Sequence, residues 1–348
     1  MKRTVLVYLT LLMLAVASCR GGGGKSALRV YDVGKEAVQF KPFEQESQNI
    51  PYWVENGARD RVLVRFSAYD GLEPVDDASL KEGALYSSDN LVYVAHRLGI
   101  IREAYWVTPT FGSVTEEDLG RLRDSLKKKY PGDAADIDGI KLNGGVASGT
   151  VNGVPVKIAG LQDLPKIDEP VLMDTDVSYL SSLYISERET RILPLMEGFF
   201  KLVAGVKLRS DLMTISASSE DGKAPLKFRF LVKYISTLFA HPDMVDADPP
   251  RQWAERAEVW RVEQDNPKAA IPLYEGIVRQ FPDDAASRYD LAEAYFRLGD
   301  LNKCADSLSE AVRLDAGYKT GYGVFAARLK AAGKADKAKE FAAAQTAR

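Results

Sequence analysis

The C-terminal part of the chain repeats with a period of about 34 residues, and this feature restricts the fold more than any other. Counted from Arg251, the blocks are 251–284, 285–318 and 319–348. In each block small residues recur where two antiparallel helices would cross, and large apolar residues recur beside them. One helix pair of this kind cannot bury its apolar face alone, so the pairs must stack. The spacing therefore predicts an all-helical solenoid at the C-terminus.

The middle block has the clearest pattern. Its core positions are, in order, Leu291, Ala292, Tyr295, Gly299, Cys304, Leu308 and Ala311. The series resembles tetratricopeptide repeats, in which large, small, aromatic and turn-glycine positions follow in this order. The resemblance implies a module that binds a protein partner on a concave surface. Trp253 and Trp260 depart from the pattern in the first helix of the first block, which we interpret as a cap of the array or as a helix that docks on the preceding domain.

The N-terminus has the pattern of an export signal. Lys2 and Arg3 precede an uncharged apolar run over 5–16, and small residues lead to Cys19. The run is shorter than the roughly 20 residues that a spanning helix needs, which favours a signal peptide over 1–18. The residues before Cys19 resemble the lipobox of bacterial lipoproteins. That resemblance implies cleavage before Cys19 and attachment of fatty acyl groups such as palmitate, because more than one acyl chain anchors a protein stably.

Two other interpretations of this N-terminus remain, an ordinary signal peptide with a coincidental cysteine and an uncleaved anchor. The lipoprotein interpretation makes 19–27 a lipidated, glycine-rich tether. It places the mature chain in the cell envelope, facing the periplasm or the cell surface. Arg20 stands where some inner-membrane lipoproteins have a retaining aspartate, which favours the outer membrane.

Composition limits the partners and the covalent chemistry of the chain. The formal net charge is -3, so the chain lacks the basic field that nucleic acid requires. Of the 2 cysteines, Cys304 loses its only disulfide partner when Cys19 is lipidated, and it is interpreted as a buried core thiol. The 2 histidines, His96 and His241, lie far in sequence from the acidic loops described below.

Residues 28–245 alternate between predicted strands and helices, which indicates a layered α/β domain with a mainly parallel sheet. Thr115, followed by acidic residues, is a good cap for the helix that begins there. Asn152-Gly153 predicts a tight hairpin turn inside 139–158. The clearest predicted strands cover 61–66, 103–107 and 212–216, and a late helix covers 227–239.

Two segments of this domain carry a further resemblance. Residues 63–72 read Leu-Val-Arg-Phe-Ser-Ala-Tyr-Asp-Gly-Leu, and 170–179 read Pro-Val-Leu-Met-Asp-Thr-Asp-Val-Ser-Tyr. In order and spacing, and with 104–109 between them, they resemble the two metal-binding loops of arginase-like proteins. The resemblance implies a three-layer fold of the arginase and deacetylase type, in which active members hold a metal pair on these loops.

The first loop departs from that family at its ligand positions. Ser67, Tyr69 and Gly71 stand where the family pattern Asp-Ala-His-x-Asp supplies ligands. The histidine that the family has upstream is missing as well, and Glu46 stands in that region. These are degenerate ligand positions, so the resemblance implies a domain that has lost most of its metal centre.

The second loop keeps its carboxylates. Asp174 and Asp176 are retained there, and Asp70 lies one position out of register in the first loop. These residues leave room for one loosely bound divalent cation, whereas a catalytic metal pair needs more donors. The same carboxylates can equally cap a helix or accept hydrogen bonds from loop amides. We therefore expect no cofactor.

The sequence thus predicts an arginase-like α/β domain over 28–245 followed by tetratricopeptide repeats over 251–348. It contains no nucleophile elbow, Walker loop or dinucleotide fingerprint. These features favour a non-catalytic, lipid-anchored binding or scaffold protein of the cell envelope. The alternative is a metal-dependent hydrolase of amidine or amide bonds that uses Asp174, Asp176 and further ligands such as Asp70 or Glu46. A third interpretation makes the middle domain a glycan binder.

Overall fold

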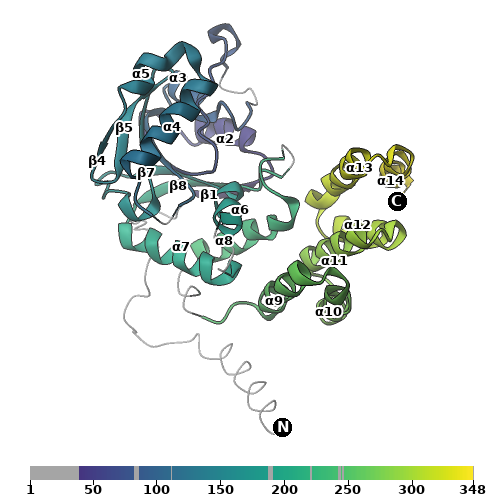
Figure 1. Cartoon of the computed structure of the whole chain (residues 1–348). Coiled ribbons are helices and arrows are strands. Elements are labelled where there is room, and N and C mark those ends of the chain that lie inside the picture. The colour runs from purple at the N-terminus through teal and green to yellow at the C-terminus, as the bar shows by residue number, and fades with distance from the viewer. Residues whose placement is uncertain are drawn as a thin grey trace.

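The computed structural model describes residues 39–81, 86–110, 112–186, 191–219, 222–241, 244 and 247–347. The predicted signal peptide, Cys19 and the tether lie outside the described residues. An α/β domain comes first, and a helical region follows it (Figure 1). Among the described helices, none combines the length and the apolar composition needed to cross a bilayer.

A single sheet of 8 described strands forms the centre of the α/β domain. The strands are β1 (Gln39–Phe43), β2 (Arg61–Phe66), β3 (Ile101–Val107), β4 (Lys141–Asn143), β5 (Val146–Val151), β6 (Val154–Ala159), β7 (Val171–Asp176) and β8 (Ser210–Ser216). Their order across the sheet is β1-β8-β7-β2-β3-β6-β5-β4. Neighbours from β1 to β6 pair in parallel, and β4 and β5 extend the sheet as antiparallel strands. This confirms the prediction of a mainly parallel sheet.

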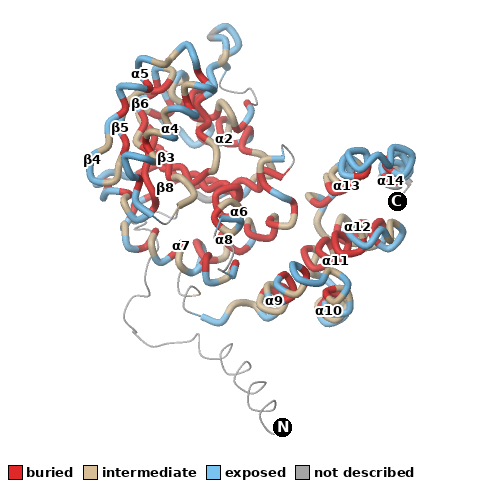
Figure 2. Tube along the Cα trace, viewed as in Figure 1, coloured by how far each residue is buried: buried red, intermediate tan, exposed pale blue. Residues whose placement is uncertain are grey.

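Helices cover both faces of the sheet, so the strands lie buried between two helical layers (Figure 2). One face carries α2 (Asn49–Glu55), α3 (Leu91–Arg97), α4 (Glu116–Lys129) and α5 (Ala134–Asp138). The other carries α6 (Val177–Ser186), α7 (Ile192–Val206) and α8 (Phe230–Ala240). Side chains alternate along β2, because successive residues of a strand point to opposite faces. Val62, Val64 and Phe66 join the core beneath α6 to α8, and Leu63 joins the core beneath α2 to α5.

Local sequence signals set the ends of several elements. Thr115 caps α4 as predicted, since its hydroxyl accepts a hydrogen bond from the N–H of Asp118 and its own N–H donates to the Asp118 carboxylate. Asn152 and Gly153 turn the chain between β5 and β6 with φ angles of 50° and 76°, which confirms the predicted hairpin. The structure adds β4, which reaches β5 through a second turn at 144–145.

The C-terminal helices form antiparallel hairpins that stack on one another (Figure 1). They are α9 (Arg251–Asp265), α10 (Pro267–Gln280), α11 (Ala285–Leu298), α12 (Leu301–Leu314), α13 (Gly321–Ala331) and α14 (Ala335–Ala347). This confirms the predicted helical region. Its apolar core is continuous with that of the α/β domain, because Leu231 of α8 and Trp260 of α9 belong to one cluster of buried side chains.

Candidate functional site

Charged and polar side chains gather at the carboxyl ends of β2, β7 and β8. In a parallel sheet these ends lie at one edge, which is where such folds place their ligands. Here the side chains are closed off from solvent: Arg65, Asp174 and Asp176 each have 0% exposure. We call the group the buried charge centre. Its members are Glu46, Asn49, Arg65, Ser67, Asp174, Asp176, Ser178, Thr214 and Ser216.

Arg65 supplies the positive charge of this centre. Its Nη2 atom donates to both carboxylate oxygens of Glu46, at 2.9 and 2.7 Å. Its Nε atom lies 3.5 Å from Oδ2 of Asp174. The other oxygen of Asp174 accepts hydrogen bonds from Asn49 Nδ2 at 2.9 Å and from Thr214 Oγ1 at 2.7 Å. The guanidinium therefore joins the segment before α2 to the central strand β7.

Asp176 is engaged differently, at the start of α6. Its Oδ1 atom accepts a hydrogen bond from the backbone N–H of Ser178 at 2.9 Å. Its Oδ2 atom accepts from the hydroxyl of Ser67 at 3.2 Å and from the hydroxyl of Ser178. Asp176 thus satisfies a free N–H in the first turn of a helix, which is the capping role that its position in the sequence also allowed.

Gly71 makes room for the Arg65 side chain. Its φ of +70° lies in the left-handed region, and a Cβ atom built on it would stand 2.0 Å from Nη1 of Arg65. The same Cβ would stand 2.9 Å from Cγ2 of Val92. The guanidinium has little freedom to move away from the added atom, because it forms an ion pair with Glu46 and both side chains are buried. A residue with a side chain at this degenerate ligand position would therefore displace the arginine.

The structure does not bring Asp70 to the other predicted carboxylates. Its Oδ1 atom accepts hydrogen bonds from the phenol of Tyr130 at 2.6 Å and the N–H of Leu72 at 2.9 Å, and Lys129 Nζ lies 3.0 Å from both oxygens. Tyr69 turns away as well, and its hydroxyl donates to a backbone carbonyl at 3.3 Å. Both side chains of the first loop are thus engaged outside the buried charge centre.

Three buried carboxylates face one guanidinium, which shifts their protonation. Burial raises the pKa of Asp174 to about 6, although Arg65 and the hydrogen bond from Thr214 oppose the shift. Burial likewise raises the pKa of Glu46 and of Asp176. Burial thus favours the protonated forms of these carboxyl groups, so at mildly acidic pH the folded chain binds more protons than the unfolded chain.

A metal pair does not fit this arrangement. A divalent cation would have to enter beside the fixed positive charge of Arg65. Both oxygens of Asp176 and Oδ1 of Asp174 already accept hydrogen bonds, and Oδ2 of Asp174 lies 3.5 Å from Nε of Arg65. Across the described ranges, no three His, Cys, Asp or Glu side chains are grouped as metal ligands. The buried charge centre is built as an ion-pair network that ties strands together.

The predicted core positions of the middle repeat lie inside the helical hairpin of α11 and α12. Gly299 ends α11 with a φ of 79°, which a residue without a side chain adopts without strain. Burial raises the pKa of the Cys304 thiol to about 12, so the thiol stays protonated and unreactive at neutral pH. The buried members of the set are Leu291, Ala292, Tyr295, Cys304, Leu308 and Ala311.

The face formed by the first helices of the hairpins is covered by residues of the same chain. We call Leu226–Phe230 the docking segment; it comprises a short 3₁₀ helix and the first residue of α8. Lys227 inserts its amine 2.6 Å from Oε2 of Glu263 and 4.4 Å from the ring centroid of Trp260. The ring of Phe228 meets the same indole edge to face at 5.5 Å. Trp260 thus docks on the α/β domain, one of the two roles expected for the first helix.

The rest of the docking segment adds a second set of contacts. Arg229 donates from Nε and Nη2 to the carboxylate of Asp315, at 3.0 and 2.9 Å, and also pairs with Glu44. A Cβ atom on Gly317 would stand 1.9 Å from the Arg229 guanidinium carbon, so only glycine allows this approach. Lys227, Arg229 and the aromatic rings beside them therefore cover the part of the repeat surface formed by Trp260, Glu263, Asp315 and Gly317.

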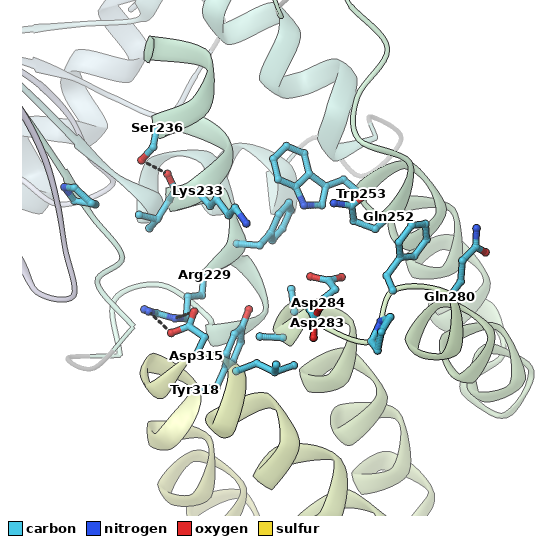
Figure 3. Close-up of a pocket in the computed structure, with 18 residues that line it drawn as sticks. Arg229, Lys233, Ser236, Gln252, Trp253, Gln280, Asp283, Asp284, Asp315 and Tyr318 are labelled. Atoms are coloured by element: carbon cyan, nitrogen blue, oxygen red, sulfur yellow. Dashed lines mark hydrogen bonds and ion pairs between the residues drawn. The ribbon is translucent and has the colours of Figure 1, made fainter. Parts of the chain in front are cut away.

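A cleft of about 800 Å³ opens beside the docking segment, between α8 and the loops of the repeats (Figure 3). Lys233 of α8 extends into it from one wall, and Asp283 and Asp284 lie on the opposite wall. The indole of Trp253 and the ring of Tyr318 line the same cleft, Tyr318 beside Arg229 and Asp315. The cleft is thus a junction site that neither part of the chain forms alone.

Comparison with protein families matches residues 261–322 to the tetratricopeptide repeat. The matched residues run from the second half of α9 to the start of α13. No curated protein matches the chain. The repeats are therefore similar to a module whose stacked helices commonly serve protein–protein interaction.

Sequence reasoning did not identify Arg65 or the docking segment. A signal for Arg65 was present: it is the one charged residue inside 62–66, and the period of a strand places it on the same face as Leu63. A buried arginine needs an acidic partner, but the sequence does not reveal that Glu46 supplies it. The signal for the docking segment was weaker, two basic residues alternating with aromatic ones.

Proposed function

We propose that this chain is a lipid-anchored binding or scaffold protein of the cell envelope, with a degenerate arginase-like domain and a protein-interaction module. The observation that carries the non-catalytic part is the position of Arg65. Its guanidinium lies between Glu46 and Asp174 without solvent exposure, so these carboxylates face a fixed internal cation. The match of 261–322 to the tetratricopeptide repeat supports the interaction part.

The competing function is a metal-dependent hydrolase of amidine or amide bonds. It requires Asp174 and Asp176 to coordinate a metal together with Asp70 or Glu46. The engagement of Asp70 with Lys129 and of Glu46 with Arg65 speaks against this assignment, because each candidate ligand already has a cationic partner.

Metal content tests the choice between the two functions. We expect the purified full chain to retain no stoichiometric manganese or zinc after exhaustive dialysis, as measured by elemental analysis. The variant Asp174→Ala and the control Asp168→Ala, on the exposed loop before β7, should give the same low value. Stoichiometric metal that is lost only in Asp174→Ala, accompanied by turnover of an amidine or an acylated amine, would establish the hydrolase.

The proposed anchor depends on Cys19. We expect the wild-type chain, expressed in a bacterium, to partition with membranes and to show a mass increase from acyl groups on its N-terminal peptide. The variant Cys19→Ser should lose both properties. Acylation that is absent from wild type, or a Cys19→Ser chain that still partitions with membranes, would rule out the lipoprotein assignment.

A further inference from the structure

The cleft between α8 and the repeats carries opposite charges on opposite walls. Lys233 and Asp283 are both exposed side chains, and no ion pair joins Lys233 to Asp283 or Asp284 among the residues drawn in Figure 3. Arg229, the other cation of the lining, differs from Lys233 because it already forms ion pairs with Glu44 and Asp315. Among the described residues that line the cleft, Lys233 is thus a cation without an ion pair, and Asp283 presents an exposed carboxylate to the same volume. Asp284 lines it as well, while its Oδ2 atom accepts hydrogen bonds from Ser287 at the start of α11.

The floor of the cleft is aromatic. Trp253, Phe230 and Tyr318 line it, and each is less than a tenth exposed, so the rings are held in place by packing. The guanidinium carbon of Arg256 lies 3.7 Å from the ring centroid of Phe230, and the ring centroids of Tyr234 and Trp253 are 4.6 Å apart. These contacts hold the rings of Phe230 and Trp253 in place. Rigid aromatic walls with polar groups above them are typical of surfaces that bind peptides with useful affinity.

The size of the cleft limits what can occupy it. Its volume of about 800 Å³ is within the range of pockets that enclose small ligands, roughly 300–1,000 Å³. A few residues of an extended chain fit into this volume, whereas a folded domain does not. The docking segment covers part of the face of the repeats next to it, and the cleft offers open space at the junction of the two parts.

We propose that the cleft binds a short extended segment of a partner protein, with a basic side chain against Asp283 and Asp284 and a carboxylate against Lys233. The charge distribution selects this occupant over a purely apolar ligand, and the two charged walls fix the direction of the segment. This inference rests on the proposed binding function and names the place where that binding occurs.

The test begins with short random peptides displayed on phage and selected on the immobilised full chain. We expect the enriched peptides to carry both a basic and an acidic residue. An enriched peptide, labelled with a fluorophore, is then titrated with wild type and with the variants Lys233→Glu and Asp283→Lys. Each variant should weaken binding by roughly fivefold or more, because each turns an attraction into a repulsion.

Two further variants sharpen the result. The double variant Lys233→Glu/Asp283→Lys should prefer a peptide in which the two charges are exchanged, and the control Lys339→Glu, on the exposed surface of α14, should bind as wild type does. Peptides that bind all variants equally would place the binding site elsewhere and leave the proposed binding function intact. A selection that enriches no peptide would overturn the cleft as a binding site, while metal content would still decide the proposed function separately.

Discussion

Arg65 joins residues that are distant in sequence, Glu46 before α2 and Asp174 on β7, and it does so without contact with solvent. Removing one partner of such a buried pair is expected to destabilise the fold by about 3–5 kcal/mol, because an unpaired charge remains. The pair therefore contributes to the packing of the segment before α2 on the sheet. Its surroundings must keep the guanidinium in one position.

Gly71 is the residue that leaves space for this position. We predict that Gly71→Ala lowers the free energy of unfolding by about 3 kcal/mol or more, since it adds backbone strain and pushes Arg65 from Glu46. Gly57→Ala is a matched control with a similar φ of +73° and no atom within 4 Å of the new Cβ, so it should lose only about 1–2 kcal/mol. Urea unfolding of both variants measures the difference, and equal losses would contradict the packing around Arg65.

The raised pKa of Asp174 predicts a pH dependence of stability. Because its folded-state pKa, about 6, lies above the ordinary aspartate pKa of 3.8, the folded state binds more protons than the unfolded state between these values. The contribution of Asp174 is thus present in full below about pH 4 and is lost as the pH rises through about 6. We expect the isosteric variant Asp174→Asn to have a flatter profile in this window than wild type. Identical slopes in urea titrations at several pH values would show that Asp174 is ionised throughout.

At the scale of elements, the sequence predicted those helix and strand ends that depend on interactions between neighbouring residues. The helix cap at Thr115 and the turn at Asn152-Gly153 need only neighbouring residues, and both were predicted correctly. β1 was not predicted, because it is a short edge strand that contains Pro42 and pairs only with β8, which is distant in sequence. The late helix expected over 227–239 is divided into a 3₁₀ turn and α8, since the docking segment follows the surface of the repeats.

The candidate site was predictable in its parts but not in its arrangement. Asp174 and Asp176 were identified by resemblance, and the sequence left open whether they bind metal, cap a helix or bond loop groups. The structure engages Asp176 at the start of α6 and Asp174 with Arg65. Only the register of β2 against β7, in which Arg65 stands beside Asp174, brings the opposite charges together, and register is not visible in one strand alone.

At the scale of the whole molecule, the chain fills two places in which a ligand could bind with its own residues. The guanidinium of Arg65 occupies the buried charge centre of the α/β domain, and the docking segment covers part of the face of the repeats. Trp260 packs against Phe228, Phe230 and Tyr184, so one apolar core runs through both parts. The expected result is a single cooperative unit, with an open cleft at the junction of its two parts.

Native-state hydrogen exchange in low concentrations of urea tests this central claim most directly, because it measures the opening free energy of each element. We predict that the amides of α9 and α11 exchange with the same free energy and the same urea dependence as those of β2 and β7. Exchange of α9 and α11 at a clearly lower free energy, while β2 and β7 stay protected, would contradict the account. The repeats would then unfold independently of the α/β domain, and the two parts would not form one cooperative unit.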